Sequence, residues 1–155
     1  MFKKILLAVD DSNVTKRAMN KVIDIQKKFH CSVVAFHAIG KIKFSVVGPI
    51  PECGMYSKFD PYPIFKKVLK EREKEGRRIL EEIKKKFKVA NLLVETRLIR
   101  AINPFEYIIS IVENEDFDLV VLGLKEKLSK LKRIFKKTVT QKVIDRIPCD
   151  IFVIR

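Results

Sequence analysis

Short apolar runs that alternate with segments of helical periodicity constrain the fold of this chain more than any other feature. Residues 5–9 are continuously apolar, as expected for a strand that is buried on both faces. Similar runs occupy residues 32–38, 92–99, 119–122 and 151–154. Between the runs, apolar residues recur every three or four positions, which indicates amphipathic helices, in residues 14–29, 64–87, 104–112 and 139–147. This alternation predicts an α/β fold with a doubly wound parallel sheet and helices on both faces.

The length and apolar content fit one domain that spans residues 1–155. The chain is 47% apolar, which is enough for a core at this size. Residues 39–63 interrupt the pattern, because they hold three of the five glycines and four of the six prolines. Glycine and proline break regular hydrogen bonding, so we expect an irregular loop at about 39–63.

Composition and missing motifs exclude several classes of protein. Three cysteines without a CxxC spacing predict reduced thiols rather than a disulfide scaffold. The first apolar run is too short for a secretion signal, and no run approaches the roughly 18 residues of a membrane span. We therefore expect a cytoplasmic protein. A serine-nucleophile elbow, a P-loop and a metal-binding spacing of His or Cys are all missing, so the sequence predicts no catalytic residue and no metal ligand.

The third and fifth runs carry signals of sheet edges. Residues 92–98 alternate apolar side chains with Glu95 and Arg97 on the opposite face, which is typical of an exposed edge strand. Residues 151–154 are apolar without such protection. Such a strand either pairs with the same strand of a second subunit or is covered by a helix or loop. We favour the homodimer.

Several segments, in their order and spacing, resemble the universal stress protein family over essentially the whole chain. They are residues 3–12, 36–38, 118–123, 131–135 and 138–154. The resemblance implies a flavodoxin-like (adenine nucleotide alpha hydrolase-like) sheet of five parallel strands in the order 3-2-1-4-5, with dimers formed through the last strand.

Family members that bind ATP carry the motif Gly-x2-Gly-x9-Gly-(Ser/Thr) after the fourth strand, where glycines let backbone N–H groups approach the phosphates. Gly123 matches the first glycine, but Glu126 replaces the second. With one extra residue in the loop, Lys137 replaces the third, and Thr138 fills the hydroxyl position ahead of Val139. A further family glycine, two residues before the proline that opens the third helix, is Ile102 here. The resemblance therefore implies a degenerate phosphate cradle.

The other positions of the implied pocket match the family more closely than the glycine motif does. Each of these residues also has an alternative interpretation in which its role is only structural. Asp10 stands where the family acid contacts the nucleotide, but it could instead cap the first helix, as could Ser12. Ala38 either contacts the base of the nucleotide or only packs within its strand. Gly123 either contacts the ligand or only forms the turn at the end of its strand. Thr138 is either a phosphate ligand or a helix cap. We expect His37 to be a satisfied, buried residue rather than a catalytic one.

Basic residues are concentrated in two segments. Residues 124–146 hold nine basic and two acidic side chains, and residues 66–88 hold eleven and five, so together they account for 13 of the net charge of +14. Lysines of the first segment could hold phosphates where glycine amides cannot. The second segment, residues 66–88, is typical of a solvent-exposed helix face. In a helix, Glu81 would lie one turn before Lys85 and could pair with it.

These observations lead to one favoured function and two alternatives. We expect a homodimeric binding or signalling module of the stress response, without efficient turnover, whose degenerate pocket binds ATP weakly. The first alternative binds ATP or AMP through lysines, with Mg²⁺ as a possible bridge to Glu126, and is at most a slow ATPase. The second is a nonspecific binder of nucleic acid or another polyanion.

Overall fold

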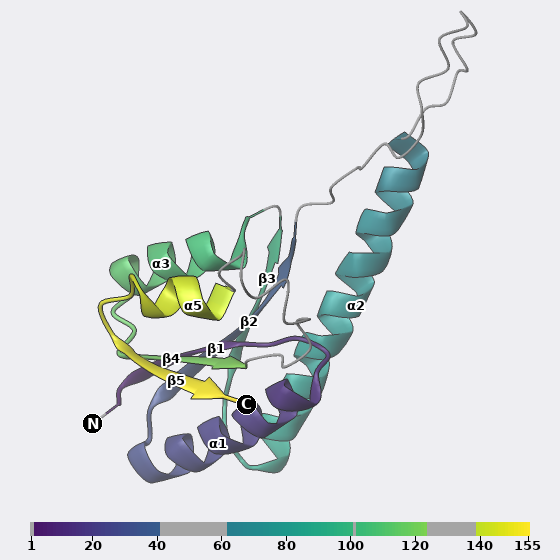
Figure 1. The fold of residues 1–155 in the computed structure, drawn as a ribbon. Helices are drawn as coiled ribbons and strands as arrows, with labels where there is room; N and C mark the ends of the chain where they lie inside the picture. The colour runs from purple at the N-terminus through teal and green to yellow at the C-terminus, as the bar shows by residue number, and fades with distance from the viewer. Residues whose placement is uncertain (1, 41–61, 101, 124–138) are drawn as a thin grey trace, which may run out of the picture.

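A computed structural model describes residues 2–40, 62–100, 102–123 and 139–155 (Figure 1). Strands and helices alternate along the chain, as predicted. In chain order they are β1 (Lys4–Ala8), α1 (Asn13–Phe29), β2 (Ser32–Ile39), α2 (Tyr62–Val89), β3 (Glu95–Arg100), α3 (Pro104–Asn114), β4 (Leu119–Gly123), α5 (Val139–Ile144) and β5 (Asp150–Ile154). Most of the expected loop at 39–63 lies outside the described residues, although Ile39 ends β2 and α2 already begins at Tyr62.

The five strands form one parallel sheet in the order β3-β2-β1-β4-β5. This confirms the doubly wound fold and places β3 and β5 at the two edges, as predicted. The chain builds β2 and β3 on one side of β1 and then crosses to the other side for β4. The strand order therefore reverses between β1 and β4, where doubly wound proteins place their ligands.

Helices cover the two faces of the sheet (Figure 1). An apolar core cluster lies on each face. On one face, Ile5 and Leu7 of β1 pack with residues of α1 and α2 such as Val22 and Ile83. On the other face, Leu6 packs with residues of α3 and α5 that include Ile108 and Val143. The central strands β1, β2 and β4 are almost completely buried, which explains their continuous apolar runs.

Helix α1 buries two polar residues, Thr15 and Gln26, that its apolar periodicity does not indicate. The expected inward positions include Ala18 and Val22, which are buried, but Thr15 and Gln26 are buried as well. Thr15 bonds to Asp10, and the Gln26 amide donates to the Leu93 carbonyl at 2.9 Å. These bonds satisfy the Thr15 hydroxyl and the Gln26 Nε2, whereas the buried Gln26 Oε1 has no hydrogen-bond partner among the described residues.

The C-terminal turn of α2 shortens β3 from the expected residues 92–99. Asn91 adopts a left-handed conformation with φ of 57°, and the Leu92 N–H donates to the Phe87 carbonyl at 2.9 Å. This is a helix-terminating arrangement, in which the Phe87 carbonyl also accepts from the Ala90 N–H at 3.0 Å. The Leu92 N–H is therefore bonded to the helix rather than to a neighbouring strand, and β3 begins at Glu95.

At Gly76, α2 lies in close contact with the sheet. A Cβ at Gly76 would lie 2.6 Å from Leu98 Cδ1 of β3 and 2.9 Å from His37 Cδ2 of β2. Only glycine therefore fits this crossing without displacing a neighbour. The α2 residues that belong to a core cluster all follow Gly76, and the preceding part of the helix extends beyond the sheet (Figure 1).

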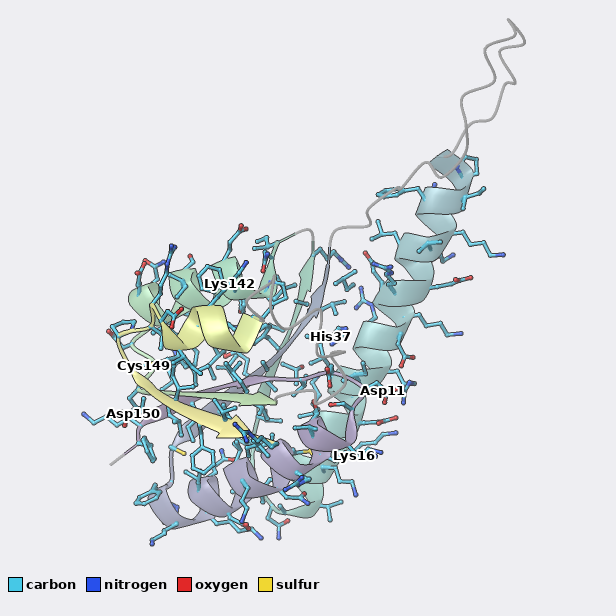
Figure 2. All side chains as sticks on the ribbon, viewed as in Figure 1. Asp11, Lys16, His37, Lys142, Cys149 and Asp150 are labelled. Carbon is cyan, nitrogen blue, oxygen red and sulfur yellow. The ribbon has the colours of Figure 1, made fainter. Side chains whose placement is uncertain are left out.

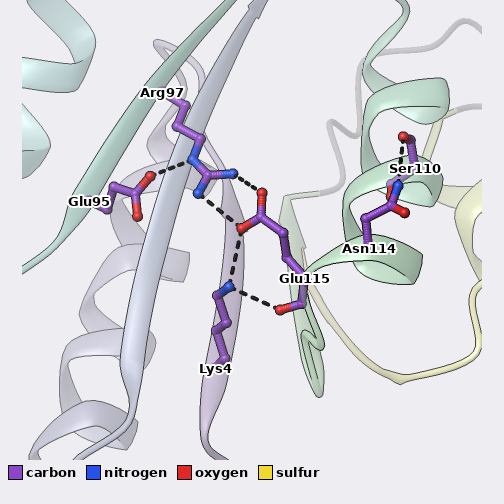
Figure 3. A network of polar contacts seen from close by, with 6 residues as sticks. All are labelled: Lys4, Glu95, Arg97, Ser110, Asn114 and Glu115. Atoms are coloured by element: carbon purple, nitrogen blue, oxygen red, sulfur yellow. Dashed lines mark hydrogen bonds and ion pairs between the residues drawn. The ribbon is translucent and has the colours of Figure 1, made fainter.

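The charged face of β3 is joined to α3 and β1 by a network of ion pairs (Figure 3). Arg97 donates from Nη1 and Nη2 to both carboxylate oxygens of Glu115, at 2.7 and 3.0 Å. Lys4 of β1 donates to Glu115 Oε2 at 3.1 Å, and Glu95 accepts from Arg97 Nε. Hydrogen bonds from Arg97, followed by those from Lys4, hold the pKa of Glu115 at about 2. The network connects the edge strand to the end of α3.

Candidate functional site

A cavity of about 250 Å³ opens at the carboxyl ends of β1, β2 and β4. It therefore lies beside the β1–β4 position at which the strand order reverses. Its walls are mainly apolar, and polar groups reach it from Asp10, Thr15 and His37. The apolar part of the wall comes from Ala8, Val9, Phe36, Ala38, Pro104, Ile108, Leu122 and Val139. This combination of apolar walls with few polar groups is typical of small-molecule sites.

Asp10 is held at the cavity by the first turn of α1. The Thr15 hydroxyl donates to Asp10 Oδ1 at 2.8 Å, and the Asp10 N–H donates back to Thr15 Oγ1 at 3.0 Å. The cap of α1 is Ser12, whose Oγ accepts from the Thr15 N–H at 3.2 Å. The structure thus assigns capping to Ser12 and leaves the Asp10 carboxylate at the edge of the cavity.

Gly123 closes β4 against α1. A Cβ at this position would lie 3.0 Å from Val14 Cγ1, which is tighter than ordinary contact. Close packing therefore gives one reason for glycine here. Gly123 also lines the cavity, so its packing role and its predicted place at the ligand are compatible.

His37 and Ala38 bring the end of β2 to the cavity. His37 is half-buried, and its Nδ1 lies 2.8 Å from the Val9 carbonyl, so this nitrogen carries a proton and donates. The ring joins β2 to the residue before Asp10 and lies near α2 (Figure 2). His37 thus has a structural partner, as expected, and lines the cavity as well.

Four of the predicted site residues meet in this cavity: Asp10, Ala38, Gly123 and Val139. The other three, Glu126, Lys137 and Thr138, lie outside the described residues. Ile102, at the position of a family glycine, is 44% exposed.

Sequence reasoning missed several residues of the wall, among them Thr15, Pro104 and Ile108. Pro104 carries a usable signal, because proline in a first helical turn marks where α3 begins at the edge of the sheet. Ile108 follows one turn later on the inner face of α3.

Neither described cysteine is an activated nucleophile. Cys31 is buried and Cys149 is half-buried, and burial raises the pKa of both thiols. Reactive cysteines instead have a lowered pKa, because the thiolate is the nucleophile. Within the described part of the chain, no three His, Cys, Asp or Glu residues are grouped so that they could hold a metal ion.

The fold and the cavity define an α/β protein with a crevice at the topological switch point of a doubly wound sheet. The model of the universal stress protein family matches residues 1–155, so the chain belongs to this family.

Individual relatives match over most of their length. A universal stress protein of Methanocaldococcus jannaschii is 28% identical over 155 residues, which cover all of this chain and 83% of that protein. The universal stress protein UspA from Lactobacillus plantarum superimposes with a TM-score of 0.76 at 19% identity, covering 99% of this chain and 98% of the other. A universal stress protein from Archaeoglobus fulgidus, solved in complex with dAMP, superimposes with a TM-score of 0.63 at 16% identity. The match covers 99% of this chain and 98% of that chain. Among the described residues, no helix has the length and apolarity to cross a membrane.

Proposed function

We propose that this protein is a binding module that holds the adenosine part of an adenine nucleotide in the cavity at the ends of β1, β2 and β4. The observation that carries the proposal is the meeting of Asp10, Ala38, Gly123 and Val139 around one mainly apolar cavity. The cavity of about 250 Å³ is slightly smaller than the roughly 300–1,000 Å³ of typical ligand sites. Its size therefore suits a base and sugar better than a complete triphosphate.

The chemistry of the wall matches the two halves of a nucleoside. Phe36, Ala38 and Ile108 provide apolar surface for a flat base. The carboxylate of Asp10 is oriented by Thr15 and can accept hydrogen bonds from sugar hydroxyls, because a carboxylate has about four acceptor positions. The dAMP complex of the Archaeoglobus fulgidus relative supports an adenine ligand.

The phosphates contribute less to binding in this proposal. Side chains stand at Glu126 and Lys137, where ATP-binding relatives have glycines. A carboxylate near the phosphates is repulsive unless a cation such as Mg²⁺ bridges them. We therefore infer that adenosine, AMP and ATP bind with affinities within about tenfold of each other, a spread of about 1.4 kcal/mol.

Isothermal titration calorimetry with adenosine, AMP and ATP, each with and without Mg²⁺, tests this proposal. Asp10→Asn should weaken all three ligands by a similar factor of about tenfold, as for the loss of one charge-assisted hydrogen bond. Asp24→Asn, an exposed site on α1, is the control and should change nothing. ATP binding at low micromolar concentration, far tighter than AMP, would refute the weak phosphate contribution. In that case Lys137→Ala should weaken ATP more than adenosine.

We further propose that the protein forms a homodimer through β5. This strand is a sheet edge, and its Phe152 is 44% exposed. An apolar edge strand favours pairing with another strand. Phe152→Lys should shift the protein toward monomer in sedimentation-velocity experiments, whereas Leu93→Lys, at a residue that is 88% exposed near the other edge, should not. A wild-type monomer at high protein concentration would contradict this assembly.

A further inference from the structure

A second, larger cavity forms a groove between α1 and α2 on one face of the sheet. Its volume is about 570 Å³, and it shares no lining residue with the cavity at Asp10. Lys16 and Met19 line it from α1, and Ile79, Ile83 and Lys86 line it from α2. These positions recur every three or four residues, so each helix presents one face to the groove.

The floor of the groove is apolar. Met19, Ile79 and Ile83 are nearly buried and belong to the core beneath it. Val89, at the end of α2, also lines the groove and is 84% exposed. A partner with apolar side chains could therefore remove Val89 from water and extend the layer formed by α1 and α2.

The charge of the groove is unbalanced in favour of lysine. Its two carboxylates, Asp11 and Glu82, both pair with Arg78, and the Asp11 contact measures 3.4 Å. The lysines that line the groove are Lys16, Lys85 and Lys86, and none of them forms an ion pair with a described residue.

The expected partner of Lys85 is engaged elsewhere. Glu81 pairs at 3.1 Å with Lys84 rather than with Lys85. Asp11 and Lys16 lie at the start of α1, close to α2 (Figure 2). The groove therefore has an apolar floor and three lysines that form no ion pair with a described residue, against two carboxylates that share Arg78 with Glu75.

We propose that this groove docks an acidic, amphipathic segment of another protein. In helical form, such a segment would place apolar side chains at i, i+3, i+4 and i+7 on the floor and carboxylates against the lysines. A second copy of this chain is a poor occupant, because each copy carries a net charge of +14 and the lysines would face basic surface. Nucleic acid is disfavoured because the groove is not lined by an aromatic residue on which a base could stack.

Fluorescence anisotropy with a labelled synthetic peptide tests the proposal. The probe is a helix of about four turns with leucine at i, i+3, i+4 and i+7 and glutamate elsewhere. The combined variant Lys16→Gln, Lys85→Gln and Lys86→Gln should weaken binding by about tenfold, since exposed charge pairs are individually modest. Val89→Asp should weaken it by about threefold, the scale of losing part of one apolar contact.

Lys88→Gln is the matched control, because Lys88 is an exposed lysine on the same helix but does not line the groove. It should change the affinity by less than about twofold. The replaced lysines are exposed, so thermal unfolding of the triple variant should match that of the wild type.

Three results would overturn the docking proposal. They are equal binding of a scrambled peptide of the same composition, equal weakening by Lys88→Gln, and tighter binding of a single-stranded oligonucleotide through the same three lysines. Absence of peptide binding at millimolar concentration would also overturn it. The proposal is independent of nucleotide binding, so the Asp10→Asn variant should bind the probe peptide normally.

Discussion

Glu115 should make the stability of this protein depend on pH in the acidic range. Its carboxylate accepts two hydrogen bonds from Arg97, at 2.7 and 3.0 Å, and one from Lys4 at 3.1 Å. These bonds lower its pKa from an ordinary 4.5 to about 2. The unfolded chain therefore binds a proton at a higher pH than the folded chain does. The stabilisation is complete above pH 4.5 and is lost as the pH falls toward 2.

The magnitude follows from the pKa shift and from the exposure of the side chain. A shift from 4.5 to about 2 corresponds to an upper limit of about 3.4 kcal/mol in the free energy of unfolding. The Glu115 side chain is 34% exposed, so solvent screens much of this interaction. We expect Glu115→Gln to lower the free energy of unfolding by about 1 kcal/mol at pH 7.

Urea unfolding of the wild type and Glu115→Gln between pH 7 and pH 2 measures the effect. The difference between the two proteins should be constant above about pH 5 and should shrink steadily below it. Glu113→Gln, an exposed site on the same helix, is the control and should show no such pH dependence. The reasoning fails if the difference at pH 7 is negligible, or if it persists unchanged at pH 2.

Three further substitutions test the close contacts of α1 and α2. Gly76→Ala should destabilise the protein by about 1 kcal/mol despite better helix propensity, because the new Cβ meets Leu98 and His37. Urea unfolding measures this, with exposed Arg77→Ala as the control, and a gain in stability would contradict the crossing geometry. Ser12→Ala removes the cap of α1 and should cost about 1 kcal/mol in the same assay; an unchanged midpoint would argue against the cap. Thr15→Val removes the hydroxyl that orients Asp10, so calorimetry should show several-fold weaker adenosine binding, and unchanged affinity would exclude this positioning role.

The sheet was predictable because its strands differ in burial. β1 and β4 are covered on both faces, and their sequences are continuously apolar as a result. β3 has one charged face, and Glu95 and Arg97 correctly marked it as an edge. The full strand order came from the family resemblance, since apolar periodicity alone identifies elements and edges without ordering them.

The polar contacts were less predictable because their partners are far apart in the sequence. The buried amide of Gln26 donates to the carbonyl of Leu93, and no local pattern indicates that bond. The same holds for Arg97, which marks β3 as an edge strand but also binds Glu115, the residue that follows α3. At the candidate site, Asp10 lines the cavity, but its predicted contact with a nucleotide stays a prediction, and its support by Thr15 depends on the turn geometry. The predicted roles of Glu126, Lys137 and Thr138 remain predictions.

Because only the part of α2 that follows Gly76 joins a core cluster, we expect the two parts of this helix to differ in local stability. Backbone amides that follow Gly76 lie on the core side of the crossing, beside Ile79, Leu80, Ile83 and Phe87. Residues 62–75 contribute to neither core cluster within the described structure. Amide hydrogen exchange should therefore proceed by local fraying in residues 62–75 and only by near-global opening beyond Gly76. A single continuous helix would then report two separate opening energies, with the boundary set by one glycine.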